Sequence, residues 1–321
     1  MHLTWPRVLV LAAVVLVACG AVRVATPSPG GRTDEVITLR FDGMTRRYRL
    51  HLPPGQRPGP MAVMLALHGG GGTAAQFEGE NGLDAVADRE GFVTIHPDGT
   101  GPRPNRFFTW NAGEACCGWA REHDVDDVGF LAAVLRDASG RTSIDPARVY
   151  VTGHSNGAMM AYRFAAERAD LVAAVIAVSG AMTSARFNPS RPVPVLDIHS
   201  IDDPRAPYAG GTGPPFPGTD HRVRHASVIA GLKRWAARDG CGSVPVVGPT
   251  RDGVGPNRGQ SVTHLVWPRC DAGMTVEHLR LSGVGHGWPG AVVPAGRRDL
   301  IGPGTTLVDA AEAAWEFARR Y

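Results

Sequence analysis

The chain has 321 residues, of which 43% are hydrophobic and 20% charged, so it is long and apolar enough to bury a sizeable core. Its 33 basic and 30 acidic residues are interspersed and leave a formal net charge of +3. A protein that binds nucleic acid concentrates basic residues in a patch or stripe, so this mixture argues against a nucleic acid partner. The length permits one large α/β domain or two small ones.

An apolar segment lies near the N-terminus. Arg7 precedes an unbroken apolar run from Val8 to Ala18, which ends at Cys19. A helix that spans a bilayer needs about 20 residues, so this run is too short and is typical of a signal-peptide core. Its last four residues, L-V-A-C, resemble the bacterial lipobox, in which the cysteine is lipidated and becomes the mature N-terminus.

We therefore predict a lipoprotein signal peptide over residues 1–18 and lipidation of Cys19. The protein would then be extracytoplasmic and held at the cell membrane by this lipid anchor alone. An ordinary signal peptide with a chance cysteine is the alternative, and it predicts a secreted protein. Residues 19–33 follow as a flexible tether, because Thr26 to Arg32 (T-P-S-P-G-G-R) contains nothing that could join a core. Residues 34–321 remain for the folded domain.

The folded part begins with a predicted hairpin and continues with strands that alternate with helices. Val36–Phe41 and Arg46–Leu52 flank Asp42-Gly43, a pair typical of a two-residue hairpin turn. The later predicted strands are short apolar runs: Met61–Leu67, Phe92–His96, Val149–Thr152, Val172–Val178, Val195–His199 and Val276–Leu281. The predicted helices are Ala74–Arg89, Val128–Ser139, Ala158–Arg168, Ser227–Arg238 and Leu307–Arg320.

Apolar strands alternating with helices are typical of a mainly parallel sheet covered by helices on both faces. Neither an internal repeat nor a second domain is evident, so we predict one α/β domain. Ligands bind beyond the carboxyl ends of such strands, and the sequence has long loops there, at Thr100–Asp127 and Pro204–His221. Only Gly180–Pro192 separates Ser179 from the next strand, which leaves no room for a large cap domain.

The strongest motif is Gly153-His154-Ser155-Asn156-Gly157, between a predicted strand and a predicted helix. A serine in a sharp strand-to-helix turn needs small neighbours, because the strained backbone brings other segments very close. The turn exposes the hydroxyl and aims the N-terminus of the helix at developing negative charge. A bare G-x-S-x-G is common by chance, but this one has the context that the motif requires. We predict Ser155 as a nucleophile.

A serine hydroxyl needs a base to accept its proton and an acid to orient that base. On this fold the expected chain order is Ser, then Asp or Glu, then His. His286 lies in G-V-G-H-G-W-P-G after the last predicted strand, and we predict it as the base. The acid should follow the strand that ends at His199, which leaves both Asp202 and Asp203. The competing histidines, which adjoin ends of earlier strands, are His68, His96, His154 and His199.

The oxyanion of a tetrahedral intermediate needs two backbone N–H donors. The first predicted donor is the N–H of Asn156, directly after the nucleophile. The second should come from the glycine-rich segment after Met61–Leu67, and we assign it to Gly70, with Gly69 or Gly71 as alternatives. A phosphate-binding loop is a poor interpretation here, because the segment has neither G-K-[ST] nor G-x-G-x-x-G with a downstream acid.

Four cysteines remain after Cys19: Cys116, Cys117, Cys241 and Cys270. An even number in an exported protein suggests disulfides, and four cysteines allow three pairings. We predict Cys241–Cys270, which leaves the adjacent pair to bond to each other or stay reduced. A zinc site is the weaker alternative, because neither pair shows the spacing of a zinc knuckle.

Several segments together resemble the polyhydroxybutyrate depolymerase and feruloyl esterase family, including actinobacterial lipoprotein esterases. The matching segments, in order, are L-H-G-G-G-G, H-P-D-G, W-N-A-G-E-A-C-C-G, D-D-V-G-F-L, D-P-A-R-V-Y-V-T-G-H-S-N-G-A-M-M-A-Y, H-S-I-D-D-P-R-A-P-Y-A-G-G and G-V-G-H-G-W-P-G. They cover most of Leu65 to Gly290. The resemblance implies an α/β-hydrolase fold and hydrolysis of carboxylic esters through an acyl-enzyme, with no metal or cofactor.

The resemblance also selects the acid. In the usual family pattern, H-G-T-x-D-x-x-x-P-Y, the acid is the fifth residue, which here is Asp203. Ser200-Ile201 replace the usual Gly-Thr, a departure that bears on the shape of the pocket. Asp126 and Asp127 also match a family segment, and we interpret both as helix-capping residues.

Aromatic residues in the loops are candidates for a substrate pocket. Phe107, Phe108, Trp110, Trp119 and Trp288 could stack on an aromatic acyl group or roof the core. With His154 beside the nucleophile, Trp110, Trp119 and Trp288 are the predicted pocket residues. The family takes aryl esters, acetylated sugars and short hydroxyalkanoate esters, and the sequence does not choose among these small or oligomeric substrates. The other functions considered are an acyltransferase with a sugar acceptor and a non-catalytic surface lipoprotein.

Overall fold

The structure is a computed structural model that describes residues 33–55, 59–103, 105–114, 116–183, 187–216 and 220–321. The predicted signal peptide, the lipidated Cys19 and nearly all of the tether lie outside these residues. Within the described part of the chain, no helix combines the length and the apolar character needed to span a bilayer.

The described residues form one ten-stranded sheet in the order β1-β2-β4-β3-β5-β6-β7-β12-β11-β10. The six central strands, from β4 to β12, are parallel, whereas β1, β2, β11 and β10 pair antiparallel at the two edges. This arrangement confirms the predicted mainly parallel sheet. The strands are β1 Thr33–Phe41, β2 Met44–Leu52, β3 Met61–Leu67, β4 Val93–Pro97, β5 Ile144–His154, β6 Ala174–Val178, β7 Val195–Ser200, β10 Val246–Asp252, β11 Ser261–Trp267 and β12 Val276–Ser282, with a separate hairpin of β8 Gly211–Thr212 and β9 Arg224–His225.

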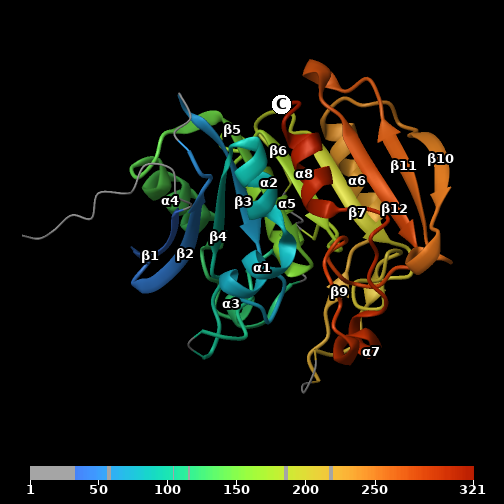
Figure 1. The fold of residues 1–321 in the computed structure, drawn as a ribbon, viewed down its shortest axis with the longest axis horizontal. Coiled ribbons are helices and arrows are strands. Elements are labelled where there is room, and N and C mark those ends of the chain that lie inside the picture. Colours follow the sequence, from blue (N-terminus) through green and yellow to red (C-terminus); the bar gives the residue numbers. More distant parts are fainter. Residues whose placement is uncertain (1–32, 56–58, 104, 115, 184–186, 217–219) are drawn as a thin grey trace, which may run out of the picture.

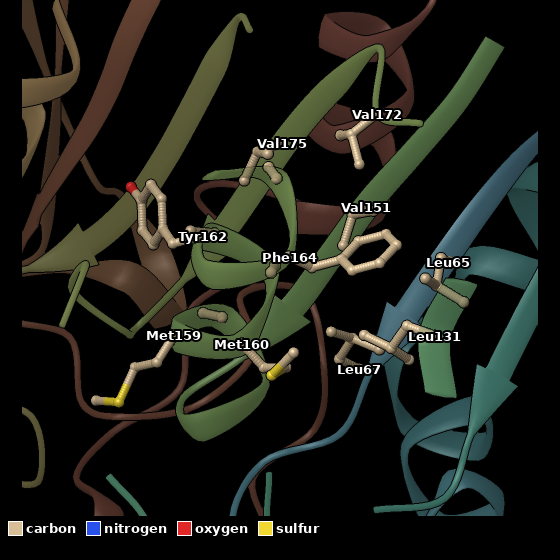
Figure 2. Packing of buried hydrophobic residues seen from close by; sticks show 14 of the residues in the cluster. Leu65, Leu67, Leu131, Val151, Met159, Met160, Tyr162, Phe164, Val172 and Val175 are labelled. Carbon is tan, nitrogen blue, oxygen red and sulfur yellow. The ribbon is translucent and has the colours of Figure 1, made fainter. Parts of the chain in front are cut away.

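Helices cover both faces of the sheet, as Figure 1 shows. They are α1 Ala74–Asn81, α2 Leu83–Glu90, α3 Gly118–Glu122, α4 Asp127–Ser139, α5 Asn156–Glu167, α6 Val228–Arg238, α7 Arg298–Ile301 and α8 Ala310–Ala318. One apolar cluster packs α4, α5 and α6 against one face, and a second packs α1, α2 and α8 against the other. In the first cluster, Phe164 and Met160 of α5 lie over Val151 and Leu67 (Figure 2).

The alternation of side chains along β3 explains why both faces are apolar. Val63, Leu65 and Leu67 belong to one cluster, whereas Met64 and Ala66 belong to the other. Successive side chains of a strand point to opposite faces, so a strand covered on both sides must be apolar throughout. β3 is therefore held at the centre of the sheet, and its carboxyl end leads directly into the glycine-rich loop.

The structure corrects two sequence predictions and adds elements that the sequence did not indicate. The helix expected over Ala74–Arg89 is divided into α1 and α2 at Gly82, whose φ of +75° ends the first helix. The short helix α3 and the antiparallel strands β10 and β11 were not predicted. Asp126 caps α4 through a bond from the Gly129 N–H (2.8 Å), but Asp127 does not cap: its carboxylate turns inward to Arg46.

Both pairs of cysteines are bonded. The predicted Cys241–Cys270 disulfide is confirmed, and it ties the end of α6 to the connection between β11 and β12. Cys116 and Cys117 bond to each other, which was one of the two outcomes left open for them. The connection from β6 to β7 contains no helix or strand in its described residues, in agreement with the predicted absence of a large cap.

Candidate active site

Ser155 occupies the sharp turn between β5 and α5, with a φ of +56°, a conformation that is rare for residues other than glycine. The neighbouring glycines make this turn possible. A Cβ on Gly157 would lie 2.1 Å from the carbonyl oxygen of Leu67, and one on Gly153 would lie 2.4 Å from the backbone of Gly157. Any larger residue at these positions would clash with backbone, so the motif has a direct steric cause.

The structure brings Ser155, His286 and Asp203 into one hydrogen-bonded line. The hydroxyl of Ser155 lies 2.8 Å from Nε2 of His286, and Nδ1 of His286 lies 2.7 Å from Oδ2 of Asp203. The other carboxylate oxygen of Asp203 accepts hydrogen bonds from the backbone N–H groups of Arg205 and Ala206, each 2.8 Å long. These two bonds fix the carboxylate, which in turn fixes the orientation of the imidazole.

The charge state of Asp203 suits this arrangement. Burial acts to raise the pKa of this carboxyl, but the charge of His286 and hydrogen bonds from His199 and His286 outweigh it and hold the pKa well below its usual range. An ionised Asp203 keeps the proton of His286 on Nδ1, so Nε2 is left as an acceptor. The imidazole can therefore take the proton of the Ser155 hydroxyl.

The structure also separates the two adjacent aspartates. Oδ2 of Asp202 accepts hydrogen bonds from the backbone N–H of Gly283 (2.7 Å) and the hydroxyl of Ser282 (3.0 Å), at the end of β12. Asp202 is thus a turn residue that faces backbone, whereas Asp203 faces His286. Sequence reasoning from the residues alone had left this choice open.

His154 and His199 support His286 and Asp203 from outside the hydrogen-bonded line. Nε2 of His154 donates to the backbone carbonyl of His286 (2.9 Å), and burial followed by the charge of His286 lowers the pKa of His154 to about 3. His154 is therefore neutral and holds the backbone of the candidate base. Nε2 of His199 donates to the carbonyl of Ala206 (2.9 Å) and lies 3.4 Å from Oδ2 of Asp203.

The glycine-rich loop lies beside the nucleophile, as an oxyanion site requires. The N–H groups of Gly71 and Gly72 donate to the carbonyls of Phe108 (2.7 Å) and Gly69 (3.0 Å), so neither is free for a ligand. This excludes Gly71 as the second donor. Gly70 packs directly against Asn156, since a Cβ at Gly70 would lie 3.5 Å from the Cβ of Asn156. Gly70 and Asn156 therefore stay the candidate donors, with Gly69 as the remaining alternative.

Trp110 is not a pocket residue, contrary to the prediction. It is fully buried beneath the glycine-rich loop, where its indole N–H donates to the carbonyl of His68 (2.9 Å). Its backbone is held by the side chain of Asn156, which accepts from the Trp110 N–H (2.7 Å) and donates to the Trp110 carbonyl (3.0 Å). Trp110 therefore positions the two candidate oxyanion segments, a role that depends on backbone contacts and had no signal in the sequence.

A cavity of about 1080 Å³ opens over Ser155, large enough for a drug-sized ligand. Trp119, Trp288 and His154 line it, as predicted. Its wall also includes Phe216 and Met159, which sequence reasoning did not single out. Figure 1 shows α3, β9 and α7 gathered at the edge of the sheet where the central strands end, and all three contribute residues to the cavity.

Two clusters of potential metal ligands occur in the described residues, both outside this cavity: Asp34, His51 and Asp84, and Glu78, Asp84 and His96. Their histidines do not suit a metal. Both ring nitrogens of His51 already face carboxylates, of Asp34 (2.6 Å) and Asp88 (2.8 Å). Nε2 of His96 accepts a hydrogen bond from the side-chain amide of Asn81, so the ring proton lies on Nδ1. Neither ring nitrogen of His96 then has a lone pair available for a metal.

The sheet order and the turn at Ser155 define an α/β-hydrolase fold. A solved structure described as acetyl xylan esterase from Aspergillus awamori is similar in fold, with a TM-score of 0.54 and 18% sequence identity over 84% of this chain and 97% of that one. At this level of identity the likeness concerns the fold alone.

Residues 46–212, more than half of the chain, match the family model described as "Esterase PHB depolymerase", so the chain belongs to this family. A protein of Nocardia uniformis subsp. tsuyamanensis named "Putative esterase NocK" is 31% identical over 86% of this chain and 79% of its own length. The "Bifunctional acetylxylan esterase/xylanase XynS20E" of Neocallimastix patriciarum is 25% identical over 77% of this chain, which spans only 32% of that relative. The protein is accordingly a carboxylic-ester hydrolase of the serine hydrolase fold.

Proposed function

We propose that this protein is an exported, lipid-anchored serine esterase in which Ser155, His286 and Asp203 form the catalytic triad. The single observation that carries the proposal is the 2.8 Å contact between the Ser155 hydroxyl and Nε2 of His286, in line with the buried Asp203. The lipid anchor at Cys19 rests on the sequence, since residues 16–19 (L-V-A-C) resemble a lipobox.

The reaction follows from this geometry in two halves. His286 removes the proton from Ser155 as the serine oxygen attacks the ester carbonyl, and the oxyanion that forms accepts hydrogen bonds from the N–H groups of Asn156 and Gly70. His286 then donates its proton to the departing alcohol, which leaves an acyl group on Ser155. A water molecule, deprotonated by His286, releases this acyl group as the free acid and restores the serine.

The substrates we propose are aryl or acetyl esters and short hydroxyalkanoate esters. The wall formed by Trp119, Phe216 and Met159 is apolar and large enough for a flat ring or a short chain. The acetyl option is supported by the sequence relative from Neocallimastix patriciarum, which is named as an acetylxylan esterase. With a sugar acceptor present, we expect free acid as the main product, whereas transfer of the acyl group to the sugar would indicate an acyltransferase.

The proposal is tested by Ser155→Ala, measured with a fluorophosphonate probe and with a panel of methyl ferulate, short p-nitrophenyl esters and hydroxybutyrate oligomers. We expect the variant to lose both covalent labelling and all turnover. Ser143→Ala, an exposed serine away from the cavity, is the control and should behave like the wild type. Turnover that persists in Ser155→Ala would remove this mechanism, and a wild type with neither labelling nor turnover of any ester would indicate a binding protein.

A further inference from the structure

Two of the arginines that line the cavity differ in whether a carboxylate lies next to them. At the mouth, Arg297 faces Glu80 across the opening, with 3.5 Å between Nη1 and Oε1. Arg205 lies deeper and is half-buried, and one of its guanidinium nitrogens donates to the carbonyl of Pro215 (3.1 Å). Among the residues that the structure describes, no carboxylate lies within 4.0 Å of the Arg205 guanidinium. The nearby Asp203 is occupied by His286 and by backbone N–H groups.

His225, on β9, lines the same cavity and is half-buried. Its Nδ1 is buried without a hydrogen-bond partner in the described part of the chain. Burial followed by the charge of His286 lowers the pKa of His225 to about 4, so at neutral pH its ring is uncharged and still has one N–H to donate.

The backbone of Arg205 and the ring of His225 both lie against Gly213. A Cβ at Gly213 would lie 2.8 Å from the carbonyl oxygen of Arg205 and 2.9 Å from Nε2 of His225. The pairing of β8 with β9 places His225 opposite Gly211, and the N–H of Gly213 donates to the carbonyl of Val223 (2.9 Å). The absence of a side chain at Gly213 thus allows the two residues to share one section of wall.

We propose that Arg205 and His225 form a subsite for a carboxylate on the alcohol part of the ester, a proposal that rests on the esterase function proposed above. A carboxylate accepts two parallel hydrogen bonds from a guanidinium and a further one from a neutral imidazole N–H. A half-buried cation without an acidic partner has lost part of its hydration, which a bound anion would replace.

The path of the proton indicates that the subsite faces the alcohol part of the ester. The alcohol oxygen must lie at Nε2 of His286 when it leaves, because it takes the proton from that atom. Asp203 holds the opposite nitrogen of the same ring and accepts the N–H of Arg205 (2.8 Å). Arg205 and His286 also line the same cavity, so we assign the departing alcohol to the section of wall that carries Arg205.

Two matched substrates test the proposal: 3-butyryloxybutyrate and its neutral analogue 3-butyryloxybutyramide. They share the acyl group and the carbon skeleton of the alcohol, so the ratio of their kcat/KM values measures the effect of the carboxylate alone. We expect the wild type to favour the acid by about tenfold or more, as a charge-assisted pair allows. Arg205→Gln, which keeps the backbone N–H on Asp203, should reduce this ratio to nearly 1. Arg297→Gln, at the mouth of the same cavity, should leave the ratio unchanged.

A binding measurement separates this subsite from the esterase chemistry. Isothermal titration calorimetry with Ser155→Ala should show binding of the acid, about tenfold weaker binding of the amide, and loss of the difference when Arg205→Gln is added. His225→Phe should lose part of the preference and serves as a second variant if Arg205→Gln does not fold. No preference in the wild type, or equal losses in Arg205→Gln and Arg297→Gln, would overturn the subsite. Failure to hydrolyse either ester, with the calorimetric difference intact, would contradict the esterase proposal alone.

Discussion

Asp127 offers a quantitative test of how the candidate site is supported. Its carboxylate is 0% exposed and accepts one bond from Arg46 (2.8 Å) and another from the backbone N–H of Asn111 (2.8 Å). The guanidinium of Arg46, itself 2% exposed, lies 3.7 Å from the ring centroid of Phe130. Asn111 follows Trp110, whose backbone holds Asn156, so this ion pair lies at the base of the oxyanion segment.

The change we consider is Asp127→Ala. Removing one partner leaves a buried guanidinium uncompensated, which costs about 3–5 kcal/mol of unfolding free energy. The Asn111 N–H also loses its acceptor, at about 1 kcal/mol. With an unfolding entropy of about 2.1 cal/mol/K per residue over roughly 290 residues, a combined loss of about 4–6 kcal/mol lowers Tm by roughly 7–10 °C.

Differential scanning calorimetry and equilibrium urea unfolding measure this loss, and Asp126→Asn is the matched control. Asp126 is the neighbouring residue, it is exposed, and asparagine can cap α4 equally well, so we expect a change below about 0.5 kcal/mol. The double variant Arg46→Met with Asp127→Leu should recover most of the stability, because it buries no unpaired charge. A loss below about 1 kcal/mol in Asp127→Ala, or a double variant as unstable as the single one, would refute this account.

Three further predictions concern the triad acid, a buried carboxyl and the lipid anchor. Asp203→Asn should lower kcat at least about a hundredfold, whereas Asp202→Asn should lose less than about tenfold, and the reverse order in a steady-state assay would show that Asp202 is the acid. Burial raises the pKa of Asp239 to about 7, so between about pH 4 and pH 7 the folded state keeps a proton that the unfolded chain releases, and stability falls as the pH rises. Over this range the wild type should thus lose about 2–4 kcal/mol of unfolding free energy relative to Asp239→Asn, as measured by urea unfolding. A difference that stays constant with pH would contradict this expectation. Cys19→Ala, expressed in a bacterial host, should leave the membrane fraction or remain unprocessed, and unchanged partitioning into detergent would exclude the lipobox.

The sequence predicted the residues of the candidate site better than their supports. Ser155 and His286 lie in glycine-rich motifs whose steric demands are local, so the motifs indicate the geometry directly. The roles of Trp110 and Asp127 depend instead on contacts with Asn156 and Arg46, which are 46 and 81 residues away. Neither spacing nor periodicity reports such contacts, which explains why one was predicted to line the pocket and the other to cap a helix.

The secondary structure, too, was predicted in some elements and missed in others. The central strands were predicted because both of their faces are buried, which requires continuous apolar runs. The edge strand β10 escaped prediction, since most of its side chains are exposed and it contains Pro249. The break between α1 and α2 was missed because an isolated glycine does not always end a helix, and only the φ of +75° at Gly82 shows that this one does.

The topology of the first hairpin places the start of the described chain and the cavity at opposite ends of the sheet. Thr33 pairs with Leu52 on β2, and β2 runs antiparallel to β4, so the chain joins the sheet at the edge where the parallel strands begin. The cavity over Ser155 opens at the other edge, where those strands end. The predicted tether from Cys19 would thus join the domain at the end of the sheet away from the opening. The tether would then meet the domain well away from the serine, so an anchored protein would keep its opening clear of the point of attachment.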